Sequence, residues 1–223
     1  DLPISLSGHN AVVFNNKLFI HGGETFMDGT YQDNNQTYEL VTNTNGISWT
    51  TDSINSTYGQ GADSESAIIE NKLLTIHGNK VSYTTDGRNW TTLNTNFPTN
   101  LAKYTAINFN EKLFIIGGLQ NPLTDATAIG NVYSTKSEPV TCNTSGSLVC
   151  SVDSLTMVAD FAIGSASAAY STTLNKAYIF GGYTNMFTDG IFEFDPSTQQ
   201  VVQRSNLPTP LSQTSAVYFP PND

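Results

Sequence analysis

The sequence predicts an all-β fold assembled from four copies of one repeated unit. Three observations support this prediction. A pair of short apolar runs joined by a turn recurs four times, the second run of each pair ends at glycine, and no segment shows the three-and-four spacing of an amphipathic helix. The 223 residues are 38% hydrophobic, which is enough to bury the core of such a domain.

Each repeat is centred on a turn with lysine at its exit. The four turns are Asn16-Lys17, Asn71-Lys72, Glu111-Lys112 and Asn175-Lys176. The apolar run after each turn ends at Gly22-Gly23, Gly78, Gly117-Gly118 or Gly181-Gly182. Successive lysines are separated by 40 to 64 residues, so the loops vary in length while the central hairpin is kept.

Two further strands are predicted after each hairpin. They cover residues 36–41 and 47–50 in the first repeat and residues 80–84 and 89–93 in the second. In the third they cover residues 131–134 and a segment near 148–152, and in the fourth residues 191–194 and 200–203. Four short strands in a unit of about 40 to 60 residues are typical of a β-propeller blade. The predicted blades are residues 7–52, 63–94, 102–153 and 165–205, and residues 212–219 form the first strand of a fifth. The chain is therefore expected to be an incomplete propeller or part of a larger one.

This pattern resembles the kelch repeat of the galactose-oxidase central-domain-like superfamily, over essentially the whole chain. The resemblance is closest in the fourth copy, with its Phe180-Gly-Gly-Tyr183 and Phe192-Glu-Phe-Asp-Pro196. It is weaker in the second copy, where Asn79 replaces the second glycine, and the third and fourth copies lack the tryptophan found as Trp49 and Trp90. The resemblance implies inner strands that line a central channel, with binding loops at the two ends. We expect both tryptophans to pack between blades.

The charge of the chain argues against nucleic acid and anionic membranes as partners. Its formal net charge is −10, and its basic residues are scattered singly. Such a field repels phosphate-rich surfaces. No apolar run approaches the length of about 18 to 20 residues that spans a bilayer, so no membrane insertion is expected in this segment.

Cysteines and glycosylation sequons indicate an extracellular location, secreted or at the cell surface. Cys142 and Cys150 bracket a short polar loop and are predicted to form a disulfide, although a metal site is the alternative interpretation of such a pair. Asn-X-Ser/Thr sequons occur at Asn35, Asn55, Asn89 and Asn143. The chain begins at Asp1 without methionine, which is expected of a processed mature protein or an excised fragment.

The loops after the glycine pairs are the predicted binding regions. They cover residues 24–34, 119–129 and 183–190, and the candidate binding residues in them are Phe26, Tyr31, Tyr183, Met186 and Phe187. Large apolar side chains in polar loops suit either a protein partner or stacking on sugar rings. The alternative is that each side chain folds back to plug the end of its own blade.

Enzymatic interpretations have weaker support in the sequence. His21 and His77 end equivalent strands and could face one metal, but shared packing of equivalent positions is the stronger explanation for them. A copper oxidase of the galactose-oxidase type would need a cysteine cross-linked to tyrosine, whereas both cysteines lie in one loop. The 19 Asp and Glu residues are spread over the loops, with no calcium-loop spacing. No catalytic residue, metal ligand or cofactor is therefore predicted.

The sequence thus predicts a non-catalytic extracellular interaction module. Recognition of a protein partner, or self-association through propeller loops and edges, is the leading hypothesis. A carbohydrate-binding propeller is the second hypothesis, and a fragment of a secreted propeller enzyme such as a copper radical oxidase is the third.

Overall fold

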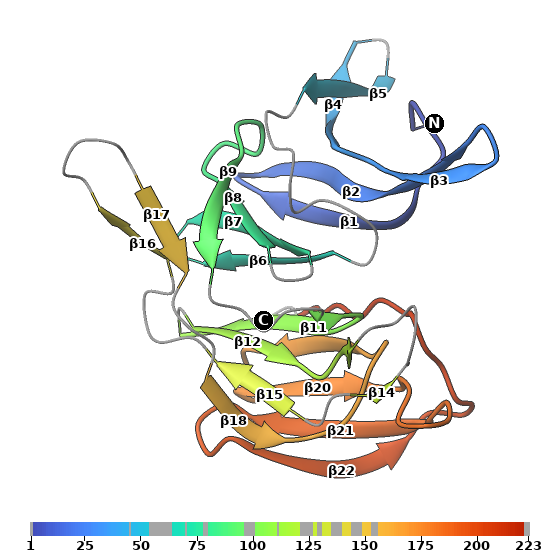
Figure 1. The fold of residues 1–223 in the computed structure, drawn as a ribbon, viewed down its shortest axis with the longest axis vertical. Helices are drawn as coiled ribbons and strands as arrows, with labels where there is room; N and C mark the ends of the chain where they lie inside the picture. Colours follow the sequence, from blue (N-terminus) through green and yellow to red (C-terminus); the bar gives the residue numbers. More distant parts are fainter. Residues whose placement is uncertain are drawn as a thin grey trace. The chain divides into compact units, whose positions relative to one another are not determined.

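The computed structural model describes residues 2–44, 46–53, 64–69, 71–77, 80–95, 101–110, 112–120, 127–128, 131–134, 140–143, 149–152 and 156–220. All the regular elements among these residues are β-strands, which confirms the predicted all-β class with four repeated sheets (Figure 1). The described residues contain no helix that is long and apolar enough to span a bilayer. The chain divides into two compact units, residues 1–97 with 140–152 and residues 98–139 with 153–223.

The described residues of the first unit form two sheets. The strands of the first sheet are β1 (Ser7–Phe14), β2 (Lys17–Met27), β3 (Thr30–Asp33), β4 (Gln36–Asn43) and β5 (Gly46–Ser53), in the order β1-β2-β4-β5 with β3 on β2. Those of the second are β6 (Glu65–Ile69), β7 (Lys72–His77), β8 (Lys80–Thr84), β9 (Thr91–Thr95), β16 (Val140–Asn143) and β17 (Val149–Val152). Its order is β16-β17-β9-β8-β7-β6, and β17 pairs with β9 in parallel.

In the second unit, the part of the chain that the structure describes forms two four-stranded sheets and one small sheet. The third sheet has β11 (Thr105–Phe109), β12 (Lys112–Ile116), β15 (Asn131–Ser134) and β18 (Thr156–Asp160), paired in that order. The fourth has β19 (Ser167–Ser171), β20 (Lys176–Phe180), β21 (Gly190–Asp195) and β22 (Gln200–Asn206), also in chain order. The small sheet joins β10 (Leu101–Ala102), β13 (Leu119–Gln120) and β14 (Thr127–Ala128).

Asparagine at the first turn of each repeat has a conformational role. Asn15 and Asn16 have φ of 49° and 60° between the paired residues Phe14 and Lys17. Two left-handed residues in a two-residue hairpin loop match the twist of the flanking strands, and asparagine tolerates this conformation better than most residues. Asn71 and Asn175 also have a φ of 57°.

Each unit has an apolar core between its two large sheets. In the first unit, Phe14 and Phe19 pack with Leu73 and Trp90, and the Trp90 indole donates a hydrogen bond to Thr37 Oγ1 (3.2 Å). Trp90 therefore lies between two sheets, as the sequence predicts, whereas Trp49 is half-buried. The core of the second unit comprises Ile107, Phe109, Phe114, Ile116, Ile163, Ala177, Ile179 and Phe194.

Two segments differ from the sequence prediction. The fourth strand of the third sheet is Thr156–Asp160 rather than a segment near 148–152, so this sheet extends past the predicted limit of 153. Residues 149–152 instead pair with β16 and, across a long sequence separation, with β9. Residues 212–219 form no strand, and none of the described strands pairs with them.

Candidate functional site

The first candidate surface is the tip of the β2–β3 hairpin. Phe26 and Tyr31 are directly paired across the two strands, and their ring centroids lie 5.0 Å apart. The side chains of Phe26, Met27 and Tyr31 are 61%, 51% and 68% exposed. These residues do not fold back into their own sheet, so the tip presents an aromatic pair to solvent on a regular backbone.

The base of this hairpin is fixed by the buried side chain of Asn34. Its Nδ2 donates to the backbone oxygens of Gly22 (2.9 Å) and Gln36 (3.0 Å). Its Oδ1 accepts from the N–H of Gln36 (3.2 Å) and the hydroxyl of Tyr38 (3.4 Å). A fully bonded asparagine at the base holds the strands in one position, which reduces the entropy lost when the tip binds a partner.

The sequence interpretation placed residues 24–34 in a loop and missed the hairpin. Its turn is Asp28-Gly29, with φ of 51° and 79°, and it connects the paired residues Met27 and Thr30. Asp-Gly between alternating strand residues is a strong hairpin signal, so the signal was present in the sequence. Acidic side chains flank the tip at Glu24, Asp28 and Asp33.

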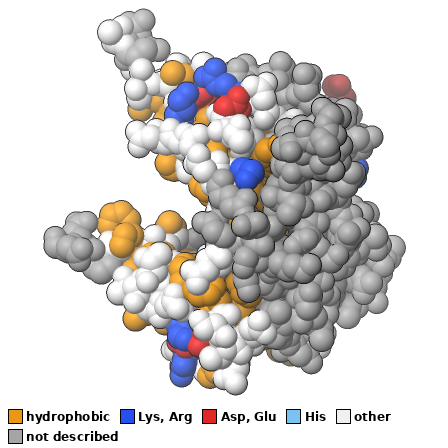
Figure 2. Space-filling model, turned by 90° about the vertical axis from the view of Figure 1, so that its left-hand side faces the viewer, with side chains coloured by type: hydrophobic (Ala, Val, Ile, Leu, Met, Phe, Trp, Pro, Cys, Tyr) orange, Lys and Arg blue, Asp and Glu red, His pale blue; other side chains and the backbone are white. Residues whose placement is uncertain are grey.

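The second candidate surface lies in the loop between β20 and β21. Tyr183 and Phe187 form an isolated bridge, and their ring centroids lie 5.7 Å apart in an edge-on contact. Tyr183 is half-buried and exchanges two backbone hydrogen bonds with Gly164 (2.7 and 2.9 Å). Met186 and Phe187 are 73% and 61% exposed. The five predicted binding residues thus form two patches, one in each unit. On the face drawn in Figure 2, hydrophobic side chains of the described residues reach the surface in small groups.

The histidines do not form a cluster. His21 is fully buried, its Nε2 lies 2.9 Å from the hydroxyl of Ser66, and its ring contacts Trp90. Burial, with a smaller contribution from His9, lowers its pKa to about 4, so the ring is neutral at physiological pH. Within the described part of the chain, no three His, Cys, Asp or Glu side chains come together as metal ligands would.

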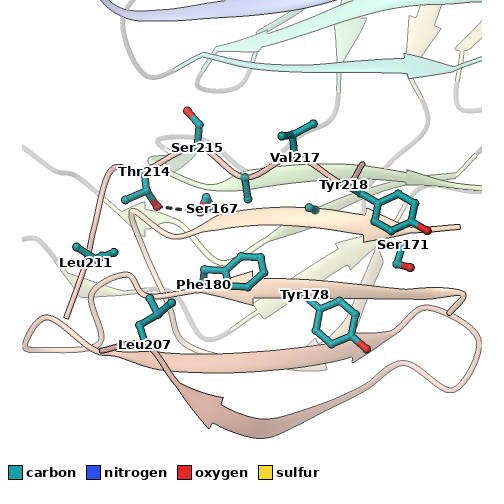
Figure 3. Close-up of a pocket in the computed structure, with 12 residues that line it drawn as sticks. Ser167, Ser171, Tyr178, Phe180, Leu207, Leu211, Thr214, Ser215, Val217 and Tyr218 are labelled. Carbon is teal, nitrogen blue, oxygen red and sulfur yellow. Dashed lines mark hydrogen bonds between the residues drawn. The ribbon is translucent and has the colours of Figure 1, made fainter. Parts of the chain in front are cut away.

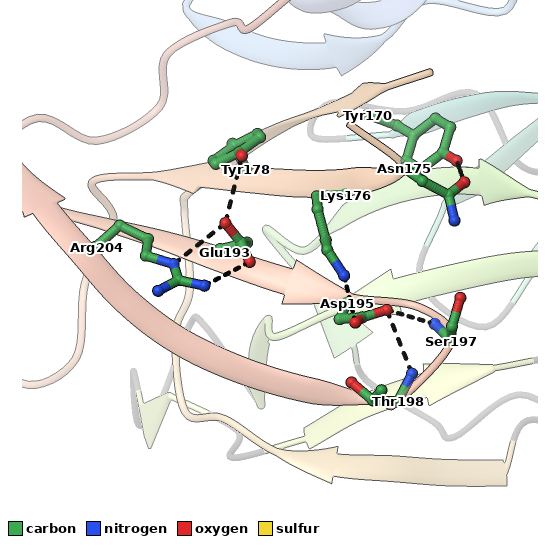
Figure 4. A network of polar contacts seen from close by, with 9 residues as sticks. All are labelled: Tyr170, Asn175, Lys176, Tyr178, Glu193, Asp195, Ser197, Thr198 and Arg204. Atoms are coloured by element: carbon green, nitrogen blue, oxygen red, sulfur yellow. Dashed lines mark hydrogen bonds and ion pairs between the residues drawn. The ribbon is translucent and has the colours of Figure 1, made fainter. Parts of the chain in front are cut away.

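The carboxylates with shifted pKa values form structural ion pairs. Burial opposes ionisation of Glu39, but hydrogen bonds from Lys17 (2.8 Å) and Arg88 (3.0 Å) outweigh it and lower the pKa. In the fourth sheet, Arg204 lowers the pKa of Glu193 and Lys176 lowers that of Asp195 to about 2 (Figure 4). A general acid needs a raised pKa, so these groups are suited to stabilising strands rather than to catalysis.

The second unit also contains a cavity of about 500 Å³ beside β19 and β20 (Figure 3). Its walls combine apolar side chains such as Phe180, Leu207 and Leu211 with the hydroxyls of Ser167 and Thr214, which bond each other at 2.9 Å. The residues that line it include no Asp, Glu, His, Lys or Arg. It is therefore suited to an apolar occupant rather than to a charged substrate.

Comparison with known proteins supports the fold. No family model matches the chain, and no curated protein matches it. Among solved structures, the chain is similar to that of YjhT, with a TM-score of 0.67 and 15% sequence identity, over 94% of this chain and 68% of YjhT. YjhT is a kelch-type β-propeller.

The similarity to YjhT shows a propeller-like fold and carries no information on ligand or activity at this level of identity. In this fold the glycine pairs are structural. A Cβ on Gly117 would lie 1.9 Å from the backbone oxygen of Ile163, and one on Gly181 would lie 2.2 Å from that of Leu211. The recurring glycines therefore allow close approach of backbones and are not a phosphate-binding loop.

The remaining predicted site residues are described in part. Asn35 and Asn89 are exposed, Asn55 lies outside the described residues, and only the backbone of Asn143 is described. Cys142 and Cys150 are direct backbone partners on β16 and β17. The structure describes only the backbone of these two residues, so the disulfide stays a prediction.

Proposed function

We propose that this chain is an extracellular, non-catalytic, kelch-type module that binds a protein partner through the tip of the β2–β3 hairpin. The observation that carries the proposal is the exposed pair Phe26–Tyr31 on a hairpin fixed by Asn34. Rigid aromatic side chains provide much contact area at small conformational cost, and they are frequent among residues that dominate binding energy.

The charge around the tip defines the chemistry of the partner. Asp28 lies in the turn at the tip, Glu24 and Asp33 are paired with each other two residues away from the aromatic pair along the hairpin, and the chain carries a net charge of −10. A partner surface with an apolar pocket and a basic rim would complement this tip, and its association would weaken as salt increases.

Affinity capture with the full chain tests this function. Immobilised wild-type chain should retain a protein from the extracellular medium or cell surface of its source. The double variant Phe26→Ala/Tyr31→Ala should bind that protein with an affinity at least about tenfold lower. Ile47→Ala is the matched control, because Ile47 is 71% exposed in the same sheet. Equal capture by the double variant and the wild type would contradict the proposal.

Carbohydrate binding is the second candidate, and the Tyr183–Phe187 pair favours it. The pair lies beside the polar side chains of Thr184, Asn185 and Asp189, and sugar sites combine a stacking ring with hydrogen-bonding groups in this way. A glycan array probed with wild type and Tyr183→Ala distinguishes the two functions. Binding that depends on Tyr183 would assign this loop to a sugar, and it would leave the hairpin experiment unaffected.

A fragment of a copper radical oxidase remains the third hypothesis of the sequence, and no observation favours it. The buried His21 is bonded to Ser66, and the backbone pairs Cys142 with Cys150 rather than with a tyrosine. Elemental analysis of purified protein for stoichiometric copper would test this hypothesis directly.

A further inference from the structure

The β2–β3 hairpin brings two carboxylates together on one face. Glu24 and Asp33 are direct partners across the two strands, and side chains in such a pair have Cβ atoms about 4.5 to 5.5 Å apart. Like charges directly opposite each other destabilise a strand pair. The hydroxyl of Ser7 donates to Oε1 of Glu24 (3.4 Å), but a neutral hydroxyl does not offset the second negative charge.

The lysines and arginines of the first unit do not neutralise this acidic pair. The sequence of the unit contains four of them, and the structure describes all four. Lys17 and Arg88 both bind Glu39. Lys72 and Lys80 begin β7 and β8 in the second sheet, and neither carboxylate of the acidic pair forms an ion pair with any described lysine or arginine.

The absence of a described cation distinguishes the acidic pair from three other carboxylates on strands. Glu39, Glu193 and Asp195 each bind a lysine or arginine of their own unit. Glu24 and Asp33 have a similar place on a strand and repel each other, so a cation supplied from outside the unit would stabilise them.

The aromatic pair lies on the same face as the acidic pair. Alternate side chains of a strand share a face, so Glu24 lies beside Phe26 on β2, and Asp33 lies beside Tyr31 on β3. Positions two residues apart on a strand are separated by about 7 Å. The two rings are tilted by 59°, with centroids 5.0 Å apart, and they form two aromatic walls next to the carboxylates.

This combination favours a guanidinium group over other cations. Calcium and magnesium take oxygen ligands, so the rings would contribute nothing to binding them. An ammonium group is a compact and strongly hydrated charge. A guanidinium group is planar, stacks on aromatic faces and presents a fork of N–H donors that can bond two carboxylates at once.

The arginines of the sequence itself are already engaged. There are two, Arg88 and Arg204, and they bind Glu39 and Glu193. Neither is therefore available to the hairpin, whatever the arrangement of the two units.

We propose that Glu24, Phe26, Tyr31 and Asp33 form a seat for an arginine side chain of the protein partner. The guanidinium lies between the two carboxylates, and the stem of the arginine lies across the rings. This inference rests on the proposed function, because it names the charged group by which the hairpin holds its partner. The hydrogen bonds of the buried Asn34 fix the base of the hairpin, so the four side chains are held in place before the arginine arrives.

Matched peptides test the seat on the full chain at low ionic strength. The first is acetylated Gly-Ser-Arg-Ser-Gly amide, and the second has citrulline in place of arginine, which keeps the shape and removes the charge. The arginine peptide should shift the backbone amide NMR signals of residues 24–33, and the citrulline peptide should bind at least about tenfold more weakly. Equal binding of the two peptides, or shifts that lie outside this hairpin, would overturn the proposal. So would calcium that shifts these signals when the arginine peptide does not.

Variants then assign the contacts. Glu24→Gln/Asp33→Asn keeps the shapes of the side chains and should weaken binding of the arginine peptide about tenfold. Asp28→Asn is the charge-matched comparison, because it removes a charge from the turn of the same hairpin, and it should weaken binding less than about twofold. Phe26→Leu/Tyr31→Leu keeps apolar contact without ring faces and should weaken binding about threefold.

A loss in Asp28→Asn as large as that in Glu24→Gln/Asp33→Asn would show general attraction to a negative surface and would overturn the seat. The comparison of the two peptides on the wild-type chain decides the question even if a variant does not fold.

The seat and the proposed function can fail separately. Suppose that Glu24→Gln/Asp33→Asn captures the protein partner as tightly as the wild type does, while Phe26→Ala/Tyr31→Ala loses it. The hairpin then binds a partner, and the arginine seat is wrong. If instead the peptides behave as expected and the aromatic double variant captures protein as well as the wild type, the seat stands and the proposed function is wrong.

Discussion

At the scale of single residues, His21 shows how burial fixes a protonation state. Its Nε2 is paired with the hydroxyl of Ser66, while its Nδ1 is buried without a hydrogen-bond partner. A charged imidazolium here would lose its hydration without gaining a second acceptor, which is why burial lowers the pKa so far. The ring that packs against Trp90 is therefore the neutral form at physiological pH.

This lowered pKa predicts a stability that depends on pH. The unfolded imidazole titrates near 6.5 and the folded one at about 4, so unfolding takes up a proton between these values. The free energy of unfolding should be highest above pH 6.5, fall as the pH decreases towards 4, and lose about 2 kcal/mol from this residue between pH 7 and pH 5. Urea titrations followed by tryptophan fluorescence measure this change, because Trp49 and Trp90 both lie in the first unit.

His21→Gln should remove most of that pH dependence, since glutamine does not titrate. His9→Gln serves as the comparison and should keep most of the pH dependence, because His9 is exposed on β1 of the same sheet and makes only the smaller contribution to the lowered pKa. An unchanged pH dependence in His21→Gln would show that another group is responsible.

A second residue prediction concerns glycine. Gly117 has a φ of 65°, and an added Cβ would lie 1.9 Å from the oxygen of Ile163, whereas Gly29 has a φ of 79° and open space around it. Gly29→Ala should therefore cost only the left-handed strain of about 1 kcal/mol, and Gly117→Ala should cost at least about 3 kcal/mol because the backbone must also move. Urea unfolding followed by circular dichroism compares the two variants, and equal losses would contradict the steric explanation.

At the scale of elements, the sequence predicts hairpins well and distant pairings poorly. The turns at Asn16-Lys17 and Asn175-Lys176 are local, since the left-handed conformation depends on the asparagine itself. The hairpin at Asp28-Gly29 carries an equally local signal. It was not predicted, because the prediction followed the repeat pattern and placed residues 24–34 in a loop. The parallel pairing of Val152 with Thr95 has no local signal, because it depends on how a long insertion returns to an earlier sheet.

The β16–β17 hairpin provides an element-scale prediction. Cys142 and Cys150 are direct antiparallel partners, and such residues have Cα atoms about 4.5 to 5.5 Å apart, within the usual range for a disulfide. A disulfide closing this short loop should stabilise the hairpin by about 2.5 kcal/mol. Intact mass measured without reductant should show the loss of two hydrogens, and the double variant Cys142→Ser/Cys150→Ser should unfold at lower urea. Two free thiols in protein purified from a secretory host would contradict it.

At the scale of the whole molecule, the candidate surfaces follow from how the repeats bury their residues. Equivalent positions in neighbouring sheets become core where a further sheet covers them, as at Ile107, and cavity wall where none of the described strands does, as at Ala169. The sequence predicted both aromatic loops because large apolar side chains stand out in polar segments. It could not predict which would be exposed, since exposure depends on strand register and on the twist of each hairpin.

The extracellular location gives the last prediction, and Asn35 is the residue that tests it. Asn35 is exposed, next to the buried Asn34, and its sequon is completed by Thr37, so a glycan can extend into solvent without disturbing the hairpin base. In a secretory host Asn35 should carry a glycan, and enzymatic release should convert it to aspartate, a change that peptide mass spectrometry detects. Asn35→Gln should remove this modification and leave the unfolding midpoint nearly unchanged. An unmodified Asn35 in the secreted protein would argue against a glycoprotein at this position, and retention of the folded chain in the cytosol of its source would argue against an extracellular role altogether.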